Sequence, residues 1–482
     1  MLFNSLPFAV FLPLAFAIYW LLGRRHIRVQ NGFLILASYI FYGWWDWRFL
    51  FLIFVSSLAD FIIGWKLDVN KSKLHRKLLL LGSLMVNLGI LGFFKYFNFF
   101  IDSFAELIAA IGMNPNLPTL RIILPVGISF YTFQTLSYTI DIYRREIQHT
   151  RDPLAFFAFV SFFPQLVAGP IERASNLLPQ FFSQRTFDNA KARDGMRQML
   201  WGFFKKMVIA DNMAPHVQSI YANYDHLDGF TLLLGTFFFA IQIYCDFSGY
   251  SDIAIGCARL FGFNLGQNFA FPYFSRDIAE FWRRWHISLS TWFRDYVFIP
   301  LSGSRCHLKR QIVNIFVTFT VSGLWHGANW TFVVWGALNG LYYLPLMLRG
   351  KQKNHSDLPA EGRIFPSPSE FVSILSTFLF TLLAWVFFRA QSVPQALEII
   401  HRIFTVKPVF TDVGVFLQPL VIASGAMIME WFQRDKQHAL DWKKWPLAIR
   451  WPGYWLLRNP GHHIGLRKFR VFRIHLFSIL GG

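Results

Sequence analysis

The stretch that decides the fold lies between Arg310 and Arg349 and reads QIVNIFVTFTVSGLWHGANWTFVVWGALNGLYYLPLML. It contains no Asp, Glu, Lys or Arg, and about 20 apolar residues are enough to cross a bilayer as a helix. The stretch is therefore long enough to cross, turn and come part of the way back. It carries His326, which would lie near the bilayer midplane if a helix starts at Arg310. An ionisable side chain at that depth is costly to bury and is a functional-site candidate by default.

The composition extends this interpretation to the whole chain. Apolar residues make up 54% of the 482 residues, whereas charged residues make up only 15%. Soluble domains carry about 25% charged residues, so the deficit indicates that lipid is the solvent. Uncharged runs recur from residues 1–23 to 413–429 and predict an all-α, polytopic transmembrane helical bundle of about ten to twelve helices. Breaks at Pro164, Pro170 and Pro300 predict re-entrant or half-helices around a polar cavity.

The net charge of +19 comes from basic residues that are scattered between the apolar runs. The positive-inside rule explains this distribution, and nucleic-acid binding is disfavoured. The loops at residues 24–28, 66–77 and 144–151 are basic, whereas the loop at 44–48 is nearly neutral. We therefore expect a multi-pass protein of the cell inner membrane, with an outside N-terminus, the basic loops in the cytoplasm and membrane lipids as its surroundings.

Several kinds of chemistry are disfavoured. The three cysteines fit neither a disulfide framework nor a thiolate metal site, and we expect no bound metal. There is no zinc-protease, nucleotide-binding or serine-hydrolase motif, which argues against hydrolysis of peptides or nucleotides.

A second polar stretch precedes the first, and residues 281–296 read FWRRWHISLSTWFRDY. At helical spacing, Arg283, Arg284, Ser288 and Arg294 would share one face with His286. This face is either an amphipathic surface at the headgroups or a second titratable lining of the cavity around His326. The sequence alone does not decide between the two.

His326 itself has two interpretations. It is either an idle core histidine or a general base, since a neutral imidazole can accept a proton from a hydroxyl nucleophile. Its depth, and the neighbouring Trp325, Asn329 and Trp330, favour the functional interpretation.

Asp246 and Asp252 lie in a strongly apolar stretch and need cationic partners, for which Arg259, Arg283, Arg284 and Arg294 are the candidates. Structural ion pairs are their expected role. Other basic residues flank the apolar runs and are either positive-inside residues or ligands for the phosphates of an activated acyl donor: Lys205, Lys206, Arg305, Lys309 and Arg310.

Seven ordered motifs carry a resemblance that covers residues 1 to about 450. They are LFNS at 2–5, FYGWW at 41–45, LPVGISFYTFQ at 124–134, FFPQLVAGPI at 162–171, YCDFSGYSD at 244–252, residues 281–295 and SGLWHGANW at 322–330. In these motifs the chain resembles the membrane-bound O-acyltransferase superfamily, and within it the alginate O-acetyltransferase branch.

The resemblance implies that His326 is catalytic and that His286 is the second signature residue of an active-site tunnel. It implies transfer of acetyl groups from a cytoplasmic donor, with acetyl-CoA as co-substrate and no permanently bound cofactor, to an extracytoplasmic polysaccharide. Periplasmic or membrane acetylation proteins are the expected partners. We assign substrate contacts to the polar and aromatic neighbours of the two histidines, Trp325, Asn329, Arg283, Arg284 and Ser288.

The end of the chain departs from this family. Relatives end in a further apolar helix, whereas residues 458–482 contain no acid and are rich in Lys and Arg. We therefore divide the chain into an acyltransferase domain at residues 1–457 and a basic tail at 458–482.

Two alternatives remain open. Within the same class, the acceptor could be another envelope polymer, peptidoglycan or teichoic acid. From a different class, a glycan or polyol transporter could use the histidines as proton relays, although no inverted repeat is evident.

Overall fold

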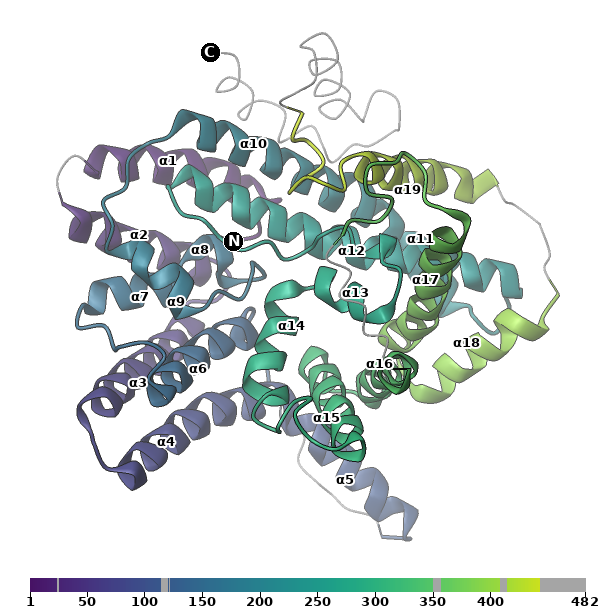
Figure 1. Cartoon of the computed structure of the whole chain (residues 1–482), viewed down its shortest axis with the longest axis horizontal. Coiled ribbons are helices and arrows are strands. Elements are labelled where there is room, and N and C mark those ends of the chain that lie inside the picture. The colour runs from purple at the N-terminus through teal and green to yellow at the C-terminus, as the bar shows by residue number, and fades with distance from the viewer. Residues whose placement is uncertain (24–25, 114–119, 121, 350–356, 408–413, 443–482) are drawn as a thin grey trace.

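The computed structural model of the chain describes residues 1–23, 26–113, 120, 122–349, 357–407 and 414–442 (Figure 1). Every regular element in these residues is a helix, and none of them lies in a strand. Six helical segments are long and apolar enough to cross a membrane. These features confirm the all-α, polytopic bundle. The six segments are Phe49–Val69, Lys73–Ala110, Gly229–Leu260, Trp330–Leu348, Pro368–Arg389 and Gly414–Phe432.

Most of the first half of the chain lies on the left of the molecule in Figure 1, while α5 projects at the bottom, right of the centre. Its α-helices are α1 (Leu6–Leu22), α2 (Ile27–Gly43), α3 (Phe49–Val69), α4 (Lys73–Leu91), α5 (Phe97–Ala110), α6 (Ile128–Arg144), α7 (Pro153–Ser161), α8 (Phe163–Leu166), α9 (Ala174–Leu177) and α10 (Asn189–Phe203).

The second half contributes the long central helix α12 and the helices on the right. They are α11 (Asp211–Ala222), α12 (Gly229–Leu260), α13 (Ile278–Arg284), α14 (Ile287–Phe293), α15 (Leu308–His326), α16 (Trp330–Leu348), α17 (Pro368–Arg389), α18 (Val393–Thr405) and α19 (Gly414–Phe432). Short 3₁₀ turns lie at Leu178–Phe181 and Pro272–Phe274.

The six long segments are fewer than the ten to twelve membrane helices expected, because several apolar runs fold as shorter pieces. The run at 122–140 contributes only to α6, whose helix begins at Ile128. The run at 153–171 is broken, since α7 ends at Ser161 and α8 ends at Leu166. The second of these runs is interrupted close to Pro164 and Pro170, where interruptions were expected.

The stretch at 311–348 forms the helical hairpin that its composition predicts. Helix α15 ends at His326, Gly327 is extended, and Asn329 caps α16 by accepting a hydrogen bond from Thr331 N at 2.9 Å. The two helices lie close together, because a Cβ atom added to Gly323 or Gly336 would come within 3.0 Å of a carbonyl oxygen of the other helix. Small residues at a helix crossing permit this approach in membrane bundles. The hairpin therefore places His326 at a fixed point, the last residue before the turn.

Polar side chains tie the remaining helices together. Asp60 of α3 is fully buried and accepts hydrogen bonds from Ser83 Oγ at 2.6 Å and Asn87 Nδ2 at 2.7 Å, both on α4. Ser83 Oγ also lies 3.0 Å from Thr139 Oγ1 of α6. A buried carboxylate needs such partners, so this network fixes α3, α4 and α6 relative to one another.

Three π-helical turns lie at Gly92–Tyr96, between α4 and α5, at Phe204–Ala210, between α10 and α11, and at Arg294–Phe298, after α14. Such turns are rare and frequently lie at functional sites. Each of these three carries charged side chains that contact other helices, among them Lys95 and Lys205.

The structure places two of the basic loops at the same end of α3. His149 Nδ1 lies 2.9 Å from Asp68 Oδ2, and Arg76 donates to Tyr143 O at 2.7 Å. The neutral loop at 44–48 lies at the other end, beyond Phe49. Helix α3 has 21 residues at about 1.5 Å each, so the two ends are about 30 Å apart, close to the thickness of the bilayer core.

This arrangement gives a topology prediction. Cysteines at the exposed positions Lys71 and Arg145 should react with a membrane-impermeant maleimide only from the cytoplasmic face, and one at Trp47 only from the opposite face. Cys306 is only partly buried and could react with the maleimide, so the experiment uses a Cys306→Ser background. Cys245 and Cys257 are buried and can be kept. Labelling of Lys71→Cys from outside intact cells would reverse the orientation.

The basic tail predicted at residues 458–482 lies outside the described residues. The last described segment, up to Trp442, packs against α10, where Ala439, Leu440 and Trp442 form a buried cluster with Leu200 and Trp201. The division of the chain at residue 457 stays a prediction.

Candidate active site

His326 lies at the carboxyl end of α15, where main-chain carbonyl groups lack helical partners. Two side chains from the π-helical turn Gly92–Tyr96 supply those partners. Tyr96 Oη donates to Leu324 O at 2.8 Å, and Lys95 Nζ donates to Trp325 O. Lys95 Nζ also lies 3.3 Å from Ser129 Oγ. A cation at the carboxyl end of a helix is favourable, so this clamp fixes the residue that precedes His326.

The imidazole of His326 lies among aromatic rings. Its centroid is 4.9 Å from that of Trp325, 5.1 Å from Trp335 and 5.4 Å from Phe388. These rings come from both helices of the hairpin and from α17. Its Nε2 atom is buried and has no hydrogen-bond partner among the described residues. A buried polar atom without a partner costs free energy, and in a native structure it calls for an explanation.

His286 lies at the junction of α13 and α14. It has a left-handed backbone, with φ 43° and ψ 55°, and its side chain is buried. Non-glycine residues rarely adopt this conformation, which tends to occur at functional sites. Its ring packs edge-on against Phe247, at 4.6 Å between centroids. Its Nε2 atom is also buried without a partner among the described residues.

The structure brings the two predicted histidines together. Their ring centroids are 6.5 Å apart, and Trp325 contacts both rings. The site therefore holds two imidazole nitrogens without partners inside an aromatic enclosure. A neutral imidazole nitrogen can accept a proton from a hydroxyl, and a water-poor enclosure strengthens electrostatic interactions within it. Within the described residues, no group of three or more His, Cys, Asp or Glu side chains could hold a metal ion.

The helical face predicted for residues 283–294 is wrong. Helix α13 ends at Arg284, and α14 begins at Ile287 after the left-handed turn at His286. Because the helix is interrupted, the residues before and after His286 do not share one face. The interruption turns His286 inward, among buried rings, whereas Arg283 is exposed.

Of the five predicted substrate contacts, Trp325 contacts both histidine rings, and Ser288 shares a hydrogen-bond partner, Asn268, with His286. The Trp325 ring stacks on Phe133 at 5.3 Å. Ser288 Oγ donates to Asn268 Oδ1 at 2.9 Å and accepts from Ile171 N at 3.0 Å. Its hydroxyl is therefore already engaged in fixing α14.

The other three lie in different surroundings. Asn329 caps α16, and its Nδ2 donates to Gln391 O at 3.0 Å. Arg284 forms an ion pair with Glu280 at 2.8 Å and donates to Ala270 O at 3.2 Å. Arg283 is exposed. Substrate contact by these residues stays a prediction.

The arginine partners predicted for Asp246 and Asp252 are wrong. Asp252 pairs with Lys205 at 2.7 Å, and Asp246 pairs with Lys206 at 2.6 Å. Because α10 and its π-helical extension lie along α12, these lysines, and not the arginines, lie next to the two carboxylates. Both lysines are therefore engaged in ion pairs, and contact with the phosphates of a donor stays a prediction. Arg259 pairs with Asp194 instead, at 2.8 Å.

Asn268 is a residue of the site that the sequence did not predict. It lies in the loop between α12 and α13, is fully buried, and its Oδ1 is 3.1 Å from His286 Nδ1. The two residues are 18 positions apart in a segment without helical periodicity, so no spacing connects them. Lys95 was missed for the same reason, because it lies 230 residues from Trp325, whose carbonyl group accepts its hydrogen bond.

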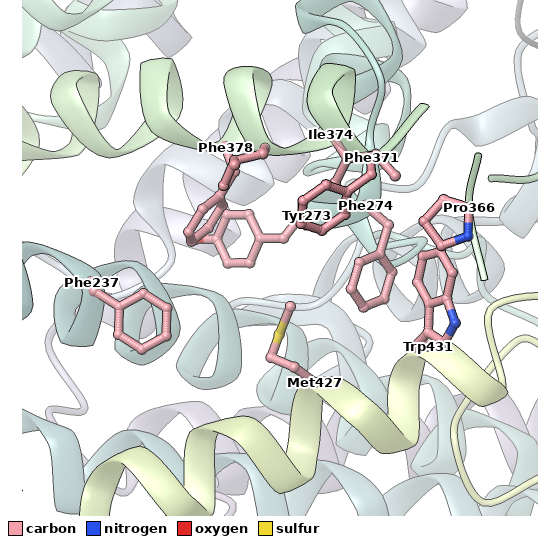
Figure 2. A pocket seen from close by; sticks show the side chains of 10 residues that line it. Phe237, Tyr273, Phe274, Pro366, Phe371, Ile374, Phe378, Met427 and Trp431 are labelled. Atoms are coloured by element: carbon pink, nitrogen blue, oxygen red, sulfur yellow. The ribbon is translucent and has the colours of Figure 1, made fainter. Parts of the chain in front are cut away.

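A cavity of about 300 Å³ lies away from these residues, between α12, α17 and α19 (Figure 2). Its lining is aromatic and aliphatic, and it contains neither histidine. The polar tips of its two amphipathic rings are engaged elsewhere, because Tyr273 Oη donates to Ala240 O and Trp431 Nε1 to Ile364 O. The cavity therefore offers no group for acid–base chemistry, and the candidate site is the histidine pair.

Comparison with known proteins identifies the family. The model of the membrane-bound O-acyltransferase (MBOAT) family matches residues 45–389, which include both histidines. The probable alginate O-acetylase AlgI of Pseudomonas aeruginosa is 40% identical over 408 residues, covering 84% of this chain and 75% of that protein. The peptidoglycan O-acetyltransferase of Helicobacter pylori is 34% identical, covering 83% and 79%. The teichoic acid D-alanyltransferase of Bacillus subtilis is 28% identical, covering 48% and 60%. The chain therefore belongs to the membrane-bound O-acyltransferase family and is a multi-pass membrane O-acyltransferase.

Proposed function

We propose that the protein transfers acetyl groups to hydroxyls of a polysaccharide, with His326 and His286 as its catalytic pair. The observation that carries this proposal is the pair of buried Nε2 atoms without partners, on rings 6.5 Å apart. An acyltransferase must remove a proton from its acceptor hydroxyl, and these two nitrogens are the groups in the enclosure suited to that task.

In the proposed reaction, the acceptor oxygen attacks the carbonyl carbon of an acetyl thioester, and Nε2 of His326 takes the hydroxyl proton. The carbon–sulfur bond then breaks, and the thiolate takes a proton from the imidazolium. The acetyl group reaches the hydroxyl either directly or through an acyl intermediate. Donor and acceptor approach from opposite faces of the membrane, with acetyl-CoA as the donor on the cytoplasmic face of the inner membrane.

The identity of the acceptor rests on the relatives. The Pseudomonas aeruginosa relative is named for alginate, which supports alginate or a similar exopolysaccharide as the acceptor here. The Helicobacter pylori relative is named for peptidoglycan and supports that polymer as the second candidate. Acetylation proteins of the membrane or the periplasm are the proposed partners.

The test is acetyl transfer from isotope-labelled acetyl-CoA in membranes that contain the full-length protein. Alginate and peptidoglycan are offered in parallel, and export of polymer is measured in the same cells. We expect label in the alginate, and none in membranes without the protein. Label in peptidoglycan alone would replace the proposed acceptor, and polymer export without any labelled product would refute the proposed reaction.

A further inference from the structure

We infer that Asn268 is a positioning residue that holds the His286 imidazole with its proton on Nδ1 and its lone pair on Nε2. This inference rests on the proposed function, because it assigns a role to His286 within the same site. The Asn268 side chain is fully buried between α12 and the α13–α14 junction.

The orientation of the Asn268 amide is fixed by its neighbours. Ser288 N, a main-chain group that can only donate, lies 3.2 Å from Oδ1, and Ser288 Oγ donates to the same atom at 2.9 Å. On the other side of the amide, Nδ2 donates to Ser251 Oγ at 3.2 Å. A flipped amide would bring its NH₂ group against the Ser288 N–H, so Oδ1 is the atom that faces α14.

This orientation determines the tautomer of His286. Oδ1 carries no proton, so the His286 Nδ1 atom 3.1 Å away must be the donor. A neutral imidazole carries one proton, and with Nδ1 protonated its Nε2 atom holds a lone pair. His286 can therefore accept a hydrogen bond or a proton at Nε2, but it cannot donate one there.

The surroundings of Nε2 leave it available for a substrate. The rings of Phe130, Phe247 and Phe269 cover His286, with centroids between 4.6 and 6.4 Å away. The titratable group that faces it is His326. Since the phenylalanines offer no conventional hydrogen-bonding group, the bare Nε2 atom is placed to accept a hydrogen bond from a hydroxyl of the polysaccharide other than the one whose proton His326 takes.

Asn268 also holds the backbone of the same junction, because its carbonyl accepts from Ile287 N at 2.9 Å. A single residue thus fixes both the left-handed turn that carries His286 and the proton on its ring. The test must separate these two roles, and a variant that keeps the acceptor oxygen does so.

Asn268→Asp keeps an oxygen toward His286 and Ser288 but adds a negative charge, which stabilises the imidazolium. His286 then stays protonated to a higher pH, and a protonated ring cannot accept at Nε2. The acidic limb of the rate–pH profile should therefore move to higher pH by about one to two units. Ser251→Ala removes only the partner of Nδ2 and should leave that limb in place. Profiles of Asn268→Asp and wild type that superimpose would overturn the inference.

A second measurement does not depend on activity or on the folding of Asn268→Asp. Nitrogen NMR of ¹⁵N-histidine-labelled wild-type protein in bilayers, with His286 assigned by comparison with His286→Gln, reports which ring nitrogen carries the proton. We expect a protonated Nδ1 and a bare Nε2, and the opposite tautomer would refute the inference directly. If the wild-type protein did not transfer acetyl groups, the proposed function would be refuted. The assignment of the His286 proton to Nδ1 would not be affected by that result.

Discussion

Replacing His326 by alanine is expected to abolish acetyl transfer while the protein still accumulates in the membrane. The variant removes the Nε2 atom that takes the hydroxyl proton in the proposed reaction. General-base assistance contributes about 10²–10⁴-fold to rate, so transfer should fall at least that far. The hairpin itself is held by the close approach at Gly323 and Gly336 and by the Lys95–Trp325 contact, none of which involves the imidazole. The measurement is labelled acetyl incorporated per amount of membrane-inserted protein.

The matched control is His401→Ala. His401 is an exposed histidine on α18, away from the aromatic enclosure, and its loss should leave transfer unchanged. Wild-type acetylation by the His326→Ala variant would exclude His326 as the base. Loss of the membrane-inserted protein itself would instead indicate a structural role for the ring, which His326→Gln would test because glutamine retains much of the volume without a basic nitrogen.

The second large effect is on stability and concerns the buried ion pair between the π-helical turn Phe204–Ala210 and α12. Lys205 Nζ lies 2.7 Å from Asp252, 2.8 Å from Ser248 Oγ and 4.0 Å from Glu430 of α19. Lys205→Met would leave two carboxylates buried without their cation. Breaking a buried pair in this way costs about 3–5 kcal/mol in the free energy of unfolding. A large fall in the thermal unfolding temperature of the detergent-purified protein is the expected result.

The neighbouring residue provides the control for this prediction. Lys206 pairs with Asp246 at 2.6 Å, but the Asp246 side chain is 50% exposed. Exposed pairs contribute about 0–1 kcal/mol, so Lys206→Met should change the unfolding temperature little. Equal effects of the two substitutions would mean that burial of the Lys205 pair does not determine its contribution.

The helical hairpin and the all-α fold were predictable because hydrophobicity is a local property of the chain. A stretch without charge that is longer than one membrane crossing must turn, and Gly327 and Asn329 mark where it does. The structure places His326 at the turn, as the last residue of α15, and its predicted depth near the bilayer midplane stays a prediction. The bounds of interrupted helices were less predictable, since the run at 153–171 has the composition of a span but breaks at Phe162.

The partners of the buried polar groups were not predictable in the same way. Which cation meets Asp252 depends on how α10 lies along α12, and nothing in the spacing of the arginines gives that arrangement. The proximity of His286 to His326 came from resemblance to a family rather than from periodicity. The break that orients His286 is a left-handed turn stabilised by Asn268, and helical spacing across residues 283–294 could not indicate it.

The π-helical turn at Gly92–Tyr96 has a consequence for how such a gene can change. A π turn accommodates one residue more than an α turn while the helices on either side keep their faces. A one-codon insertion or deletion there would create or remove the wide turn that presents Lys95 and Tyr96, without disturbing the contacts of α4. The same event elsewhere in α4 would rotate every following residue by about 100°. The hydrogen bonds from Lys95 and Tyr96 to the carbonyl groups of Trp325 and Leu324 can thus be gained or lost in a single genetic step.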